Sequence, residues 1–93
     1  MIRDFADRET EKIYHQIFST KLPQSIQKIA LRKLMMMDSA ADLKDLRVPP
    51  SNHLEKLSGD RQGQYSIRIN DQYRICFYSG EMGFEQVEIV DYH

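Results

Sequence analysis

The residues best suited to acid–base chemistry and anion binding lie in the last third of the chain. They are Arg61, Arg68, Arg74, Asp91, Tyr92 and His93. A histidine can give or take a proton near neutral pH, and a guanidinium group holds a phosphate through paired hydrogen bonds. With no cluster of metal-ligating side chains beside them, these residue types suit metal-free cleavage of a phosphodiester bond.

Two of these arginines are predicted to face each other in a hairpin. If Ile69 pairs with Tyr73 across the turn, Arg68 lies directly opposite Arg74 on the face that does not take the helices. Like charges at such cross-strand positions repel, so a compensating group is required. A simple second turn would place Glu88 beside Arg74. A surface ion pair and a bound phosphate therefore both stay open as explanations.

The last three residues carry further groups that could act on a phosphodiester. Asp91 or the terminal carboxylate could hold the ring of His93 and raise its pKa, and Tyr92 could donate to a phosphate or stack on an unpaired base. A frayed end without function is the open alternative, because terminal residues are often poorly ordered. In a regular strand only Tyr92 would share the face of Arg74, so a common site requires a bend near Val90.

No metal or cofactor site is predicted. His15, His53 and His93 lack the spacing of a zinc site, and a lone cysteine provides no Cys-x-x-Cys pair. The glycines near position 60 are not followed by the Gly-Lys-Ser/Thr of a nucleotide-binding loop. Cys76 lies in the middle of a predicted strand, where a cysteine usually packs against neighbours rather than attacking a substrate.

The N-terminal half is predicted to supply the scaffold. Residues 1–5 alternate apolar and charged side chains, which is typical of a short strand. Asp7 then caps a helix of roughly three turns. The apolar face of this helix is predicted to carry Ile13, Tyr14, Ile17 and Phe18.

A second helix is predicted from Pro23 onward. Its buried stripe consists of Ile26, Ile29, Ala30, Leu34 and Met37. The opposite face carries three basic residues that are expected to be solvated: Lys28, Arg32 and Lys33. A short helical piece around residues 39–46 and a loop over residues 51–64 complete this half.

Three strands are predicted at residues 65–69, 73–77 and 84–91, the first two joined by a turn at residues 70–72. The order of elements indicates an α+β fold. We expect an N-terminal strand and two helices packed on one face of a small, largely antiparallel four-stranded sheet.

Composition narrows the class of protein. A chain of 93 residues is long enough for one modest core, so residues 1–93 are predicted to form a single domain. The net charge of −1 argues against a protein that coats nucleic acid indiscriminately. One cysteine, no apolar leader after Met1 and no long apolar run predict a cytoplasmic protein without a membrane span.

From Arg47 onward the sequence most strongly resembles the HigB toxins of the RelE superfamily, the mRNA-cleaving halves of bacterial toxin–antitoxin pairs. The matching segments are Lys-Leu-Ser-Gly-Asp-Arg at 56–61, Tyr-Ser-Ile-Arg at 65–68, Tyr-Arg-Ile-Cys-Phe at 73–77 and Val-Glu-Ile-Val-Asp-Tyr-His at 87–93, with Gly63 and Asn70 between them. The resemblance extends over essentially the whole chain. It implies a RelE-like fold and a ribosome-dependent endoribonuclease that cuts mRNA in the decoding site.

The resemblance also implies roles for particular residues. The closing residues that inherit catalytic roles are Asp91, Tyr92 and His93. The candidates for contact with phosphate or ribosomal RNA are Lys56, Arg61, Arg68 and Arg74, of which Arg74 is grouped with the catalytic residues. A HigA-like antitoxin with a helix-turn-helix domain would neutralise the toxin, so DNA would be contacted only through that antitoxin. No cofactor is implied.

One departure from the family concerns the segment before Gly-Asp-Arg. Some relatives have a histidine at the position that matches Glu55, whereas His53 lies two residues earlier in this chain. Glu55 acting as a base, His53 moving into place and a site without this group all remain open. The alternative function is a non-catalytic protein-interaction module of the same fold.

Overall fold

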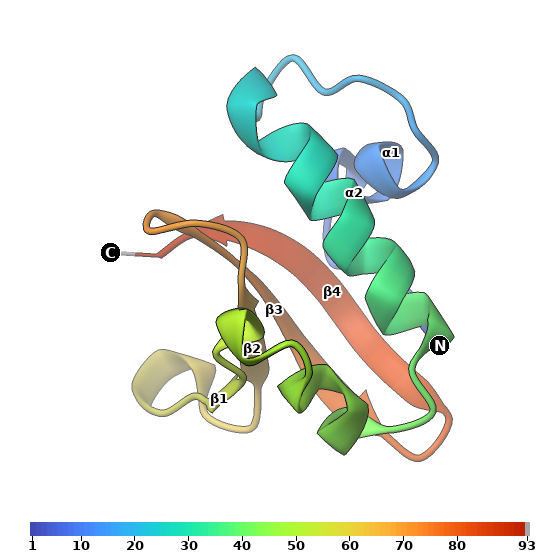
Figure 1. The fold of residues 1–93 in the computed structure, drawn as a ribbon, viewed down its shortest axis with the longest axis vertical. Coiled ribbons are helices and arrows are strands. Elements are labelled where there is room, and N and C mark those ends of the chain that lie inside the picture. The colour runs from blue at the N-terminus through green and yellow to red at the C-terminus, as the bar shows by residue number, and fades with distance from the viewer. Residues whose placement is uncertain (93) are drawn as a thin grey trace.

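Four antiparallel strands and two α-helices form the chain in a computed structural model, which describes residues 1–92. The helices are α1 (Arg8–Tyr14) and α2 (Gln24–Ser39). The strands, in sheet order, are β1 (Glu55–Lys56), β2 (Tyr65–Arg68), β3 (Tyr73–Gly80) and β4 (Gly83–Asp91). Short 3-10 helices are η1 (Leu43–Arg47), η2 (Pro50–Asn52) and η3 (Gly59–Arg61). Both α-helices cover one face of the sheet (Figure 1), which confirms the predicted α+β class.

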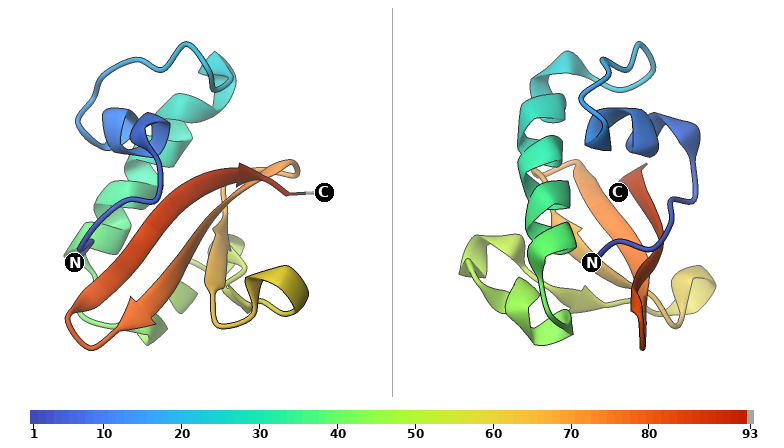
Figure 2. Two further views of the ribbon diagram at one scale, coloured as in Figure 1. Left: turned by 180° about the vertical axis from the view of Figure 1, so that it is seen from behind. Right: turned by 90° about the vertical axis from the view of Figure 1, so that its right-hand side faces the viewer.

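Side-chain alternation along β2 and β3 turns one face of the sheet toward the helices. Ile67, Ile75 and Phe77 are fully buried and belong to one apolar cluster with Ile13 of α1 and Leu34 of α2. Burial of each such side chain contributes roughly 1.5–3 kcal/mol. We call the other side of the sheet, which is turned away from α2, the distal face (Figure 2).

The N-terminal segment lies along the outer edge of β4. It forms two isolated parallel bridges, Ile2 with Phe84 and Phe5 with Val87, rather than a continuous strand. The fourth strand of the sheet is instead the two-residue β1, which lies inside the stretch that was predicted to be a loop. The fold class is therefore as predicted, but the fourth strand comes from another part of the sequence.

Helix α1 is shorter than its apolar pattern predicted. The side chain of Asp7 caps it by accepting from the backbone N–H of Thr10 at 3.2 Å, as expected. The helix ends at Tyr14, and Gln16 has a φ of 64°, which turns the chain away from the helical path. Ile17 and Phe18 were assigned to the buried face, but they are 54% and 59% exposed.

Helix α2 has the predicted buried stripe, in which Ile29 is partly buried, and two of the three residues of the predicted solvated face. Lys28 and Arg32 are exposed, whereas Lys33 is buried and donates to the side chain of Asn52 in η2. The short elements between α2 and β2 cover this part of the helix, so a charged residue that looked peripheral is enclosed. Neither α1 nor α2 combines the length and apolar character needed to cross a bilayer.

Candidate functional site

The register of the β2–β3 hairpin brings two of the predicted site residues together on the distal face. Ile67 pairs with Ile75 and Arg68 pairs with Arg74, which confirms the predicted pairing. Because side chains alternate along a strand, Arg74 shares the distal face with Ser66 and Cys76. The turn therefore determines which residues can reach the site.

Arg74 is the most enclosed of the arginines proposed for the site, with only 8% of its surface exposed. Its Nε donates to Ser66 Oγ at 2.7 Å, and its Nη2 donates to the backbone oxygen of His53. The third nitrogen, Nη1, lies 4.0 Å from Glu55 Oε1, beyond hydrogen-bonding distance. Nε and Nη2 thus bind groups of the protein itself, whereas Nη1 faces the exposed carboxylate of Glu55.

Arg68 lies opposite Arg74 in the hairpin but has a different environment. Its guanidinium donates to Asp71, which is fully exposed in the turn. Exposed ion pairs of this kind are weak and are broken at little cost. Arg68 is therefore adapted to a surface contact, whereas Arg74 is fixed in place.

The predicted terminal residues are only partly brought to this site. Tyr92 is 40% exposed, and its ring centre lies 5.9 Å from Arg74 Cζ, within the range of a cation–π contact. Asp91 pairs with Tyr73 across the sheet, and its Oδ2 accepts from Gln72 Nε2 at 3.0 Å. The residue predicted to move protons, His93, lies outside the described residues, directly after Tyr92.

The last strand does not bend near Val90, where a bend was predicted. Its irregularity lies nearer the start of β4, around Gln86. Strand β4 pairs with β3 through Asp91, and the register shifts between Cys76 and Tyr78, opposite the part of β4 where Gln86 has a φ of 51°. This irregularity has the features of a β-bulge. The alternation beyond it brings Tyr92 to Arg74 and turns Asp91 toward Gln72.

The observed β3–β4 register, set by both the turn and the bulge, also contradicts the predicted ion pair. Glu88 lies opposite Cys76 rather than beside Arg74, and it accepts from Arg61 Nη1 at 3.0 Å. Arg61 also donates to Gln64 at 3.0 Å, so its guanidinium is held over the distal face. Lys56 lies in β1 and is exposed. The carboxylate beside Arg74 is thus that of Glu55, the position at which this chain departs from some relatives.

Two groups that hold Arg74 were not predicted from the sequence. The hydroxyl of Ser66 could have been found from the hairpin register, because it lies on the same face as Arg74. The carbonyl of His53 had no such signal, since its position depends on the left-handed backbone at that residue. His53 is exposed, and it binds Arg74 through its backbone oxygen rather than through its imidazole ring.

The described residues support neither a cysteine nucleophile nor a metal centre at this site. Burial raises the pKa of the Cys76 thiol, which disfavours the thiolate that a nucleophilic cysteine requires. Among residues 1–92, no group of three or more His, Cys, Asp or Glu side chains is arranged to hold a metal ion. The arrangement is one fixed guanidinium, an aromatic ring with a hydroxyl and a nearby carboxylate, which together can bind an anion and hold a base.

Comparison with known proteins identifies relatives over almost the entire chain. A family model described as the RelE-like toxin of the type II toxin–antitoxin system HigB matches residues 3–93. Toxin HigB-1 of Vibrio cholerae is 41% identical over 78 residues, which is 83% of this chain and 82% of that protein. An uncharacterised protein of Haemophilus influenzae is 43% identical over 58 residues, which is 62% of this chain and 57% of that protein.

Proposed function

This chain belongs to the HigB-like family of RelE-like toxins of type II toxin–antitoxin systems, and we propose that it blocks translation by cutting mRNA in the decoding site of the ribosome. The proposal rests on the contact between the Arg74 guanidinium and the ring of Tyr92 on the distal face. In the sequence, Tyr92 directly precedes His93. A fixed cation beside an aromatic ring suits a phosphate and its neighbouring base.

In the proposed reaction the RNA 2′-oxygen attacks the adjacent phosphorus while the bond to the 5′-oxygen breaks. A base removes the proton of the 2′-hydroxyl, and an acid protonates the departing 5′-oxygen. We draw these two groups from His93, Asp91 and Glu55. Arg74 Nη1 stabilises the charge on the phosphate oxygens, and Tyr92 donates to the phosphate or stacks on the base.

The remaining basic residues serve substrate positioning in this proposal. Lys56 is exposed, and Arg61 and Arg68 are held by acids near the surface. We propose that these three residues contact phosphates of mRNA or ribosomal RNA. The net charge of −1 fits an enzyme that obtains much of its substrate alignment from the ribosome. Because its substrate is mRNA on the ribosome, we propose that it acts in the cytoplasm.

Membership of a type II toxin family implies an antitoxin partner. We propose that this antitoxin is HigA-like, with a helix-turn-helix domain through which the pair contacts DNA. No cofactor or metal ion takes part in the proposed reaction.

The test is cleavage of a reporter mRNA on translating ribosomes by purified variants. His93→Ala and Tyr92→Ala should each lower the cleavage rate, by roughly 10²–10⁴-fold for a proton-transfer group. The matched control is His15→Ala, which removes an exposed histidine that directly follows α1, away from the distal face. It should cleave within about twofold of the wild-type rate.

Unchanged cleavage by both site variants would remove them from the mechanism. Intact mRNA in the presence of the folded wild-type protein would favour the alternative, a non-catalytic interaction module.

A further inference from the structure

The connection between α1 and α2 presents an apolar groove that the proposed reaction does not use. Ile17 and Phe18 project at its rim with more than half of their surface exposed, and Ile13 and Leu31 line it from the two helices. The groove encloses about 290 Å³. Large exposed apolar side chains gathered at a concave surface are typical of protein-binding sites.

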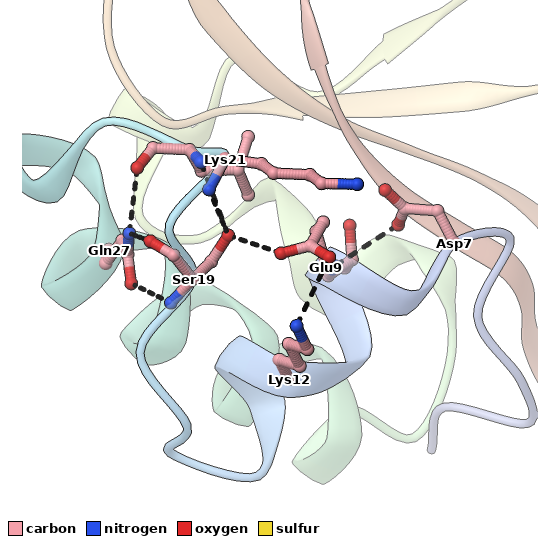
Figure 3. A network of polar contacts seen from close by, with 8 residues as sticks. Asp7, Glu9, Lys12, Ser19, Lys21 and Gln27 are labelled. Carbon is pink, nitrogen blue, oxygen red and sulfur yellow. Dashed lines mark hydrogen bonds and ion pairs between the residues drawn. The ribbon is translucent and has the colours of Figure 1, made fainter.

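A hydrogen-bond network fixes this exposed connection (Figure 3). Ser19 is fully buried, and its backbone N–H donates to Gln27 Oε1 at 3.0 Å while its carbonyl accepts from Gln27 Nε2 at 2.7 Å. Its hydroxyl donates to Glu9 Oε1 at 2.6 Å and accepts from the backbone N–H of Leu22. The residue that follows Ile17 and Phe18 is thus anchored to both helices. Their exposure is built into the fold, and little ordering entropy remains to be lost on binding.

The charges around the groove are mainly positive. Residues 8–32 contain five basic side chains and two acidic ones, although the whole chain has a net charge of −1. One of the two acids, Glu9, is already engaged by Ser19 and Lys12. The charged residue that lines the groove itself is Lys28, which is exposed. A partner that matches this surface therefore carries apolar side chains flanked by carboxylates.

We propose that an apolar, acidic segment of the antitoxin binds the groove between α1 and α2, with apolar side chains against Ile17 and Phe18 and a carboxylate beside Lys28. An amphipathic helix is the segment type that fits a groove between two helices. This inference rests on the assignment to a toxin–antitoxin pair, and not on the nuclease chemistry. RNA fits less well, because the side chains that line the groove are mainly apolar and include a single cation, Lys28.

The groove is formed by the helical layer, whereas Arg74 and Tyr92 lie on the distal face of the sheet (Figure 2). A segment bound in the groove would contact neither residue. Variants of the groove should therefore change antitoxin affinity without changing the rate of mRNA cleavage by the free toxin.

The test measures, by isothermal titration, the affinity of purified variants for the cognate antitoxin. Phe18→Ser should raise the dissociation constant at least tenfold, and Lys28→Glu at least fivefold. Matched controls are Met82→Ser, at an exposed methionine in the β3–β4 turn, and Lys44→Glu, at an exposed lysine in η1. Both controls should stay within twofold of wild type, and all variants should keep the wild-type melting temperature.

Unchanged affinity for Phe18→Ser and Lys28→Glu would overturn the proposal, as would equal losses in the controls. Loss of ribosome binding by Phe18→Ser with unchanged antitoxin affinity would identify an RNA-facing surface instead. Loss of self-association with unchanged antitoxin affinity would identify a second copy of this chain as the occupant. A wild-type chain that leaves mRNA intact would refute the nuclease proposal alone, since the affinity measurement does not depend on cleavage.

Discussion

Arg68 and Arg74 lie directly opposite each other across the β2–β3 hairpin, but their guanidinium groups are held differently. Arg68 contacts an exposed aspartate in the turn, whereas Arg74 donates to a buried hydroxyl and to a backbone carbonyl. The sequence predicted that both face away from the helices. It did not distinguish them, because the groups that bind Arg74 come from the residue after η2 and from β2.

Replacing each arginine by lysine should reveal this difference. Arg74→Lys keeps the charge but loses the planar fork that reaches Ser66 and His53 together. We expect the free energy of unfolding to fall by about 2 kcal/mol, since hydrogen bonds from a charged group are lost inside the protein. Arg68→Lys should leave stability unchanged within error. Urea unfolding of both variants measures this, and equal stabilities would show that the buried contacts of Arg74 contribute little.

At the scale of elements, local sequence signals located all three strands after residue 64, but they predicted the pairing register of the first two only. The short turn at residues 70–72 determines the β2–β3 register, and the observed pairs match those predicted. The predicted β3–β4 register was wrong by one residue at the turn, where Tyr78 pairs with Glu85 rather than Phe84, and by a second residue beyond the bulge. The positive φ of Gln86 in that bulge has no sequence signal in a non-glycine residue. Its backbone N–H donates to the side chain of Asp4, so a residue far away in the sequence helps to hold the bulge.

The contact between α2 and η2 is a second case in which tertiary structure overrides a local pattern. Lys33 donates to Asn52 Oδ1, and Asn52 Nδ2 donates to the backbone oxygen of Leu46 at 3.0 Å. Burial lowers the pKa of Lys33, so its charged form is disfavoured in the folded protein. The amide of Asn52 compensates for part of this cost, and it fixes the segment that continues to His53 and the exposed Glu55.

Removing one partner of this pair should cost more than removing both. Asn52→Leu leaves a buried ammonium group without its acceptor and should lower the free energy of unfolding by about 3 kcal/mol. Lys33→Met with Asn52→Leu should recover at least 1 kcal/mol of that loss, because the buried ammonium group without an acceptor is then absent, while the bond to the Leu46 carbonyl is lost in both variants. Lys28→Met is the control for removing a charge from the exposed face of the same helix. A double-mutant cycle in urea tests the coupling, and purely additive effects would refute it.

At the scale of the whole molecule, Asp38 joins three parts of the chain that are distant in sequence. From α2, its Oδ1 accepts from the backbone N–H of Ile2 at 2.9 Å, and its Oδ2 accepts from the hydroxyl of Tyr14 at 2.8 Å. These bonds hold the N-terminal segment and α1 against α2 while the sheet packs beneath them. The sequence pattern placed each element, but it gave no sign that one carboxylate connects them.

This junction makes the stability of the fold depend on pH. The hydrogen bond from Ile2, followed by that from Tyr14, lowers the pKa of Asp38 below its ordinary value of 3.8. A carboxylate whose pKa is lower in the folded state than in the unfolded state stabilises the fold at pH values above about 4. This stabilisation is lost as the pH falls through the folded-state pKa. The ionised side chain therefore stabilises the native protein at neutral pH and less so in acid.

Asp38→Asn should consequently destabilise the protein at pH 7 and have a smaller effect at pH 3. The variant keeps the shape of the side chain but removes the charge that strengthens both hydrogen bonds. Urea unfolding of wild type and variant at pH 7, 5 and 3 measures the difference in free energy at each pH. Asp42→Asn is the matched control, because Asp42 is exposed and its side chain does not cap η1. A difference for Asp38→Asn that is as large at pH 3 as at pH 7 would show that the ionised carboxylate is not what holds the three segments together.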